Sequence, residues 1–139
     1  MLYQLIHLDM EDVSSNQNRR KFERLDTTFT LTYRIEKPLA LSVELGITAD
    51  TDALMLNLSD SGMAITTRYN LPGGVQLLLK LNIIDLRLKG DERYRHMEIG
   101  GETVSNVSLR DAGYKIGIRF NRVLEADKRV ISNYIERNK

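Results

Sequence analysis

Residues 29–35 read FTLTYRI, a stretch in which apolar and polar side chains alternate strictly. Phe29, Leu31, Tyr33 and Ile35 share one face, and threonines and an arginine occupy the other. This alternation is typical of a β-strand with one buried face. It is the first clean strand pattern in the chain.

The same period of two recurs along most of the chain. It resumes with unchanged parity in residues 39–47, and Pro38 predicts a bend or an edge position because it cannot donate to a strand ladder. Residues 85–91 are ambiguous, and one interpretation is a strand continuation with its turn at Gly90-Asp91. Further strands are expected at residues 54–59, 63–67, 75–83, 93–99, 102–109 and 114–120, with turns at residues 48–52, 71–74 and 111–113.

Only the C-terminal end changes to the period of a helix. The apolar residues at helical spacing, with charged residues opposite, are Ala126, Val130, Ile131, Tyr134 and Ile135. Six or so short antiparallel strands followed by one helix predict a mainly β protein, a six-stranded antiparallel β-barrel with a C-terminal amphipathic α-helix. A closed barrel has no free sheet edges, and the apolar stripe of the helix needs a surface to cover.

The composition sets limits on the class of protein. At 139 residues the chain has the length of one domain. With 20 Lys and Arg against 19 Asp and Glu, its net charge argues neither for nor against a polyanionic partner. The absence of cysteine excludes disulfides and cysteine-ligated metals. No apolar run approaches the roughly 20 residues that span a bilayer, and the apolar start lacks the basic region of a signal peptide. We therefore expect a cytoplasmic domain without a transmembrane segment.

Catalytic motifs find little support in the sequence. The two histidines, His7 and His96, are far apart and belong to no ligand-spaced cluster. Ser59 and Ser61 do not lie in a Gly-x-Ser-x-Gly elbow, and no glycine-rich phosphate loop opens a helix. We expect no enzymatic activity, no metal site and no cofactor.

Two short motifs, in contrast, have the chemistry of an anion site. The first is RRKFER, residues 19–24, which places Arg19, Arg20 and Arg24 just ahead of the first strand. Guanidinium groups bind phosphate oxygens and the O6/N7 edge of guanine through paired hydrogen bonds, and they stack on bases. The alternative interpretation is a solvated linker.

The second motif is NLSDSG, residues 57–62, at the end of a predicted strand. Ser59 offers a hydroxyl to a phosphate, and Asn57 projects from the same face two residues earlier. Gly62 allows a tight turn or the close approach of a ligand. Taken alone, the motif also fits a capped turn between two strands.

Together, the motifs R-x-x-x-R at residues 20–24 and N-x-S-x-x-G at residues 57–62 resemble those of the PilZ domain family. The strand with GIRF at residues 117–120, followed by the amphipathic helix, is similar to the C-terminal end of PilZ domains. The resemblance covers residues 19–139, which we take as a PilZ-like domain. Residues 1–18 lie outside it, as an N-terminal segment of unknown structure.

The resemblance implies a non-enzymatic receptor for the bacterial second messenger cyclic di-GMP. Arg20 and Arg24 would contact guanine edges and phosphates, and Asn57 and Ser59 would hold the ligand from the barrel surface, with Gly62 permitting its close approach. In the family the arginine-bearing segment is flexible and wraps over the ligand. Binding would therefore order that segment and present a new surface to a protein partner.

Two further features, Arg19 and residues 39–47, bear on the comparison with the PilZ family beyond the two motifs. Within the family, an arginine directly ahead of the first motif looks like a mark of binding an intercalated dimer of cyclic di-GMP, whose larger charge calls for an additional cation. The alternative is that Arg19 is a solvated linker charge. Residues 39–47 depart from the family pattern and look like an added or extended hairpin, which could carry a partner surface.

Two other functions compete with this one. A PilZ-like protein–protein adaptor would bind no nucleotide, and the intact motifs argue against it. A small barrel that binds single-stranded nucleic acid would need aromatic platforms and a basic groove, whereas aromatics are 6% of the residues and tryptophan is absent. We therefore expect no DNA or RNA partner.

Overall fold

The structure is a computed structural model, and it describes residues 25–47, 49–85 and 88–138. Strand β1 (Leu25–Lys37) contains the alternating stretch from which the fold was predicted. Leu31, Tyr33 and Ile35 are buried, whereas Arg34 is exposed. One face of β1 therefore packs into a core and the other faces outward, as the alternation predicts.

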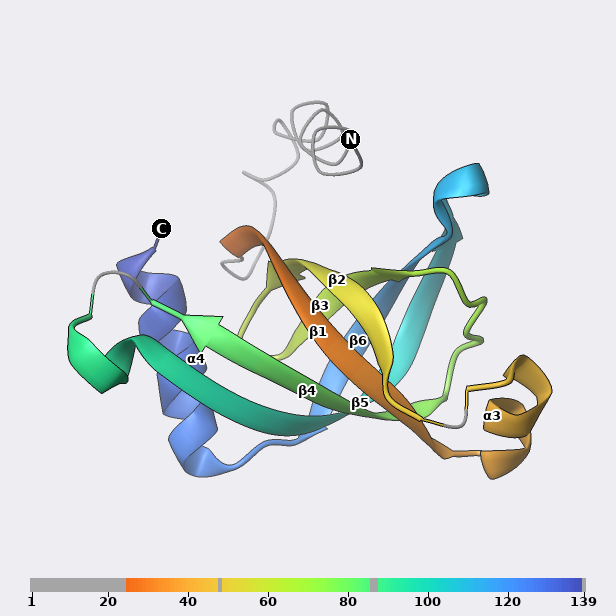
Figure 1. The fold of residues 1–139 in the computed structure, drawn as a ribbon, viewed down its shortest axis with the longest axis horizontal. Helices are drawn as coiled ribbons and strands as arrows, with labels where there is room; N and C mark the ends of the chain where they lie inside the picture. Colours follow the sequence, from red (N-terminus) through yellow and green to blue (C-terminus); the bar gives the residue numbers. More distant parts are fainter. Residues whose placement is uncertain (1–24, 48, 86–87, 139) are drawn as a thin grey trace.

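The strands that follow β1 close with it into a barrel. They are β2 (Thr51–Leu58), β3 (Gly62–Thr67), β4 (Gln76–Ile84), β5 (Tyr94–Ser108) and β6 (Tyr114–Arg122). All pairs are antiparallel, in the order β1-β2-β3-β6-β5-β4, and β4 pairs with β1 (Figure 1). The predicted six-stranded barrel is confirmed. Every strand contributes apolar side chains to one core, which is the inside of the barrel.

The predicted C-terminal helix is also confirmed, as α4 (Glu125–Arg137). Ile131, Tyr134 and Ile135 are buried and belong to the same apolar cluster as the barrel interior. The centroid of the Tyr134 ring lies 6.0 Å from that of Phe29 in β1. Figure 1 shows α4 across one end of the barrel. Because its buried side chains share one apolar cluster with the strands, the helix covers the barrel interior at that end.

Asp127 rather than Ala126 occupies the buried face of α4. Ala126 is exposed, whereas the Asp127 carboxylate is buried and accepts two hydrogen bonds from the Arg95 guanidinium of β5, at 2.9 and 3.2 Å. The prediction of an apolar contact at Ala126 is therefore wrong. An ion pair replaces that contact, and the pair satisfies a carboxylate that would be costly to bury alone.

Residues 39–47 do not form the predicted strand or hairpin. They contain a helix, α3 (Leu39–Leu45), which lies at the other end of the barrel from α4 (Figure 1). The ladder between β1 and β4 ends at Lys37, so a strand that continued past Pro38 would have no partner there. Gly46, with a φ of 74°, ends the helix in the left-handed conformation that glycine adopts easily. Neither helix that the structure describes is long and apolar enough to cross a membrane.

Residues 93–99 and 102–109, predicted as two strands, are one long strand, β5. Gly100 and Gly101 lie inside it, at a register shift in its pairing with β6. A Cβ on Gly101 would come within 3.1 Å of the Arg119 carbonyl oxygen, so glycine allows β6 to approach closely and the strand to continue. Short 3-10 turns precede β5 and β6, at η1 (Gly90–Arg93) and η2 (Arg110–Ala112). β4 ends at Ile84, so the strand continuation considered for residues 85–91 is absent from the part of them that is described.

Candidate functional site

The second motif forms the tight connection between β2 and β3. The N–H of Ser59 donates to the carbonyl oxygen of Gly62 at 2.9 Å, and the Ser59 hydroxyl donates to the same oxygen at 3.2 Å. Ser59 Oγ also accepts from the N–H of Ser61 at 3.3 Å. The hydroxyl thus caps its own turn, and it must rotate away from Gly62 before it can donate to a phosphate.

Asn57 lies on the outer face of β2, just before that turn. A bulge between Met55 and Asn57 shifts the strand register, so that Met55 and Leu58 are both in the core and Asn57 projects the other way. Asn57 is only 4% exposed, and its amide forms no hydrogen bond with any other residue that the structure describes. An amide that no other described residue engages is a group whose donors and acceptor a bound ligand can satisfy.

Gly62 has a structural reason to be glycine. A Cβ at this position would clash with the carbonyl oxygen of Ile118 in β6 and would lie 3.3 Å from the Cα of Arg119. Both neighbours are backbone atoms, which cannot move aside as the end of a side chain can. β6 therefore approaches Gly62 closely, and the close approach of a ligand at this position stays a prediction.

The residues that follow the first motif pair with the second motif. The arginines of the first motif lie outside the described residues, and they are Arg19, Arg20 and Arg24. The residues that follow are described: the Cα of Leu25 pairs with that of Leu58, and Asp26 pairs with Asn57. Leu25 directly follows the arginine motif in the sequence, and it is Leu25 that pairs at the strand end carrying the second motif.

The sequence did not predict that Arg119 lies beside the turn of the second motif. Arg119 of β6 pairs with Gly62, and the next N–H along, that of Phe120, donates to the Ser61 carbonyl oxygen at 2.8 Å. Alternation in residues 114–120 places Arg119 on the polar face. Only the pairing of β3 with β6 reveals which motif it faces.

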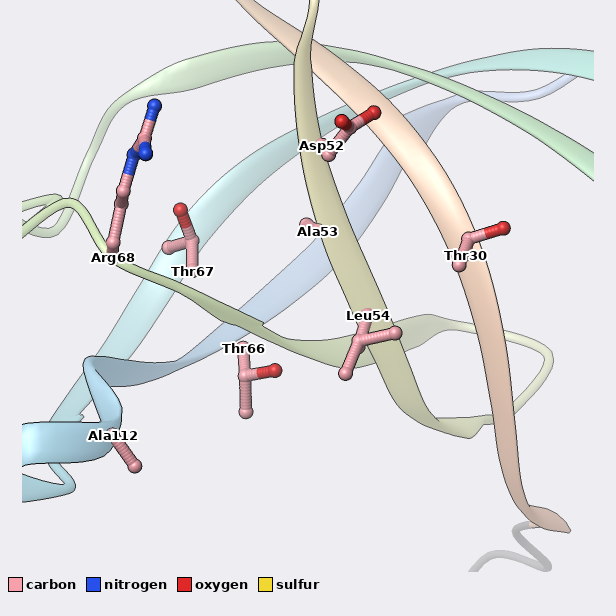
Figure 2. A pocket seen from close by; sticks show the side chains of 8 residues that line it. All are labelled: Thr30, Asp52, Ala53, Leu54, Thr66, Thr67, Arg68 and Ala112. Atoms are coloured by element: carbon pink, nitrogen blue, oxygen red, sulfur yellow. The ribbon is translucent and has the colours of Figure 1, made fainter. Parts of the chain in front are cut away.

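A cleft of about 510 Å³ on the outer face of the barrel was missed as well. Leu54 and Thr66 form the next outward-facing cross-strand pair after Asn57, and they line this cleft together with Thr30 of β1. Figure 2 shows Leu54 and Thr66 on neighbouring strands, with Arg68 extending away from them. The residues that line the cleft come from separate strands and a turn, so no local sequence pattern could indicate the cleft.

Metal-ligating side chains do not cluster in the part of the chain that the structure describes. Within residues 25–47, 49–85 and 88–138, no group of three His, Cys, Asp or Glu side chains could hold a metal ion. His96 is exposed, with Nδ1 at 3.1 Å from Asn82 Oδ1, and His7 lies outside this part of the chain. Burial raises the pKa of Tyr33, but that side chain is inside the barrel, where its hydroxyl lies 2.7 Å from Thr67 Oγ1.

Comparison with known proteins identifies the family. The PilZ domain model matches residues 18–137. Among solved structures, the Bacillus subtilis inhibitor of motility, MotI/DgrA, has a TM-score of 0.63 at 17% identity, over 86% of this chain and 50% of that one. PlzA of Borreliella burgdorferi in complex with c-di-GMP has a TM-score of 0.54 at 15% identity, over 91% and 45%. The PilZ domain of Escherichia coli YcgR with c-di-GMP has a TM-score of 0.53 at 13% identity, over 86% and 91%.

The solved structures and the family model support different conclusions. The chain spans about half the length of MotI/DgrA and of PlzA, and at such low identities the structures show the fold alone. No curated protein matches the chain. The family model, however, matches residues 18–137, which include both motifs and nearly the whole chain. The chain belongs to the PilZ domain family.

Proposed function

We propose that this chain is a non-enzymatic receptor for cyclic di-GMP that acts in the cytoplasm and needs no cofactor. The observation that supports the proposal is the pairing of Leu25 with Leu58, because Leu25 directly follows the arginine motif in the sequence and Leu58 lies between Asn57 and Ser59. The solved structures of PlzA and of the PilZ domain of YcgR are each described with c-di-GMP. Their ligand supports the same class of ligand for a member of the same family.

Each residue of the proposed site has a chemical role. Arg20 and Arg24 bind guanine O6/N7 edges and phosphate oxygens through paired hydrogen bonds, and Arg19 adds the cation that an intercalated ligand dimer requires. The Asn57 amide, which no other described residue engages, donates to the ligand and accepts from it. The Ser59 hydroxyl, once rotated away from Gly62, donates to a phosphate oxygen.

The output of the receptor is the ordering of the arginine-bearing segment on the ligand. Ordering a segment lowers its conformational entropy, so part of the gross interaction energy is lost and the affinity is moderate. About −8 kcal/mol corresponds to a micromolar dissociation constant. The ordered segment and the barrel then present a new surface, which engages a protein partner.

Calorimetric titration and thermal melting with cyclic di-GMP test the proposal. We expect binding heat and a higher melting temperature, and we expect Arg20→Ala and Arg24→Ala each to weaken binding by about 1–3 kcal/mol. Arg34→Ala is the control, because Arg34 is an exposed arginine of β1 outside both motifs. A wild-type chain that shows neither heat nor stabilisation would refute the receptor function.

The second candidate is a PilZ-like protein–protein adaptor that binds no nucleotide. The observation that favours it is that Ser59 and Gly62 already have structural roles, in the turn and against β6. Leu39 and Val43 of α3 are 70% and 73% exposed, which gives an adaptor apolar side chains to offer a partner. The same titration separates the candidates, since an adaptor gives no binding heat with cyclic di-GMP.

A further inference from the structure

Arg119 lies beside the turn of the second motif, on the outer face of β6. The preceding residue, Ile118, is buried in the barrel, so Arg119 projects outward. Its Cα pairs with that of Gly62, and the N–H of Phe120 donates to the carbonyl oxygen of Ser61 at 2.8 Å. The base of the arginine side chain is therefore fixed to the turn of the second motif.

The guanidinium of Arg119 is only weakly held. Its Nη2 lies 3.6 Å from Oε1 of Glu102 in β5, beyond hydrogen-bond distance, and 65% of its side chain is exposed. Ion pairs of this kind contribute little to stability. Arg122, further along β6, differs: its Nη2 donates to Oε1 of Glu36 at 2.9 Å, and its guanidinium lies over Gly100, where a Cβ would be 3.1 Å from Arg122 Cζ.

We propose that Arg119 is a further ligand-binding residue, whose guanidinium leaves Glu102 and binds a phosphate of the cyclic di-GMP molecule held at Ser59. This rests on the proposed function, because it takes that ligand at that turn. Guanidinium binds phosphate through two charge-assisted hydrogen bonds, which are stronger than a 3.6 Å contact with a solvated carboxylate. Glu102 is then a competitor, which occupies Arg119 in the free protein and repels the phosphate in the complex.

This arrangement predicts opposite effects for two neighbouring substitutions. Arg119→Ala weakens binding about tenfold, which corresponds to about 1.4 kcal/mol, the low end for a hydrogen bond to a charged group. Glu102→Gln strengthens binding about two- to threefold, because it frees the guanidinium and removes a like charge at a partly exposed position. Arg119→Lys keeps the charge without the paired hydrogen bonds and falls between wild type and Arg119→Ala.

Calorimetric titration of the whole chain with cyclic di-GMP measures these effects. Arg122→Ala and Glu36→Gln are matched controls, since they make the same chemical changes in a pair whose members already satisfy each other. We expect each control to bind within about twofold of wild type, as for exposed ion pairs away from a ligand. Thermal melting without ligand shows whether each variant is folded.

The outcomes separate this assignment from the receptor function. If the wild-type chain does not bind cyclic di-GMP, the proposed function fails, and the role of Arg119 fails with it. If it binds but Arg119→Ala matches Arg122→Ala, or Glu102→Gln gains no more affinity than Glu36→Gln, the receptor stands and the role of Arg119 is overturned. Should Arg119→Ala not fold, Glu102→Gln decides alone, because only a competitor at the site predicts a gain in affinity.

Discussion

The hydroxyl of Ser132, in α4, donates a hydrogen bond to Oδ1 of Asp60 across 2.8 Å. Asp60 lies in the turn of the second motif, so this bond joins the C-terminal helix directly to the candidate site. Ser132→Ala removes the bond. We expect the free energy of unfolding, measured by urea denaturation, to fall by about 0.5–1.5 kcal/mol, the usual net contribution of one hydrogen bond.

Asn133→Ala is the control for that substitution. Asn133 is the exposed neighbour of Ser132 in the same helix, and alanine raises helix propensity at either position by a similar amount. A Ser132→Ala variant as stable as Asn133→Ala would mean that the bond to Asp60 does not stabilise the folded chain.

Gly62→Ala tests why the second motif ends in glycine. The added Cβ would meet the backbone of β6 at Ile118 and Arg119, and overpacking of this kind costs about 1–3 kcal/mol. The loss should therefore appear in the free energy of unfolding of the ligand-free chain. Gly73→Ala is the control, because its Cβ would have only the Thr103 carbonyl oxygen nearby, at 3.9 Å. Equal stability of the two variants would remove the structural reason for Gly62 and favour a role in ligand approach alone.

Tyr33 should make the stability of the chain fall at high pH. Its side chain is fully buried, and burial raises the pKa of the phenol above its ordinary value, despite an opposing hydrogen bond with Thr67. Folding therefore favours the neutral phenol. Its contribution is fully present below about pH 10, the unfolded pKa, and is lost as the pH rises through the higher folded pKa.

The comparison of Tyr33→Phe with wild type isolates this contribution. We expect the unfolding free energy of wild type to fall more steeply above about pH 10 than that of Tyr33→Phe, which cannot ionise there. Tyr94→Phe, at an exposed position, should follow wild type. Coincident curves for wild type and Tyr33→Phe would contradict the expectation.

Local alternation predicted the barrel because each strand turns one face inward. Residues 29–35 and 114–120 carry that pattern within themselves, and both form strands. Alternation failed at residues 39–47, where Leu41 and Leu45 are two strand repeats apart but also one helical turn apart. The choice between helix and strand there depends on whether a partner strand is present beyond Lys37, and no local pattern records that.

The candidate site was predicted by residue type but not by geometry. The sequence indicates Asn57 and Ser59, yet it does not show that the Ser59 hydroxyl is turned toward Gly62, because that depends on the conformation of the turn. Arg119 was not predicted as a neighbour of Gly62, since β3 and β6 are distant in sequence and meet only when the barrel closes.

Arg19 decides the ligand stoichiometry in the last prediction. An intercalated dimer of cyclic di-GMP presents more guanine edges and more phosphate charge than one molecule does, and Arg19 supplies an additional cation directly ahead of Arg20. We therefore expect calorimetric titration of the wild-type chain to saturate near two equivalents of ligand, given that each further anion needs a guanidinium partner. Arg19→Leu should shift saturation toward one equivalent while Arg20 and Arg24 retain binding. Lys21→Leu is the matched control, because it removes a cation from the same stretch at a position where R-x-x-x-R specifies no residue. Saturation of the wild-type chain at one equivalent would leave Arg19 as a solvated linker charge.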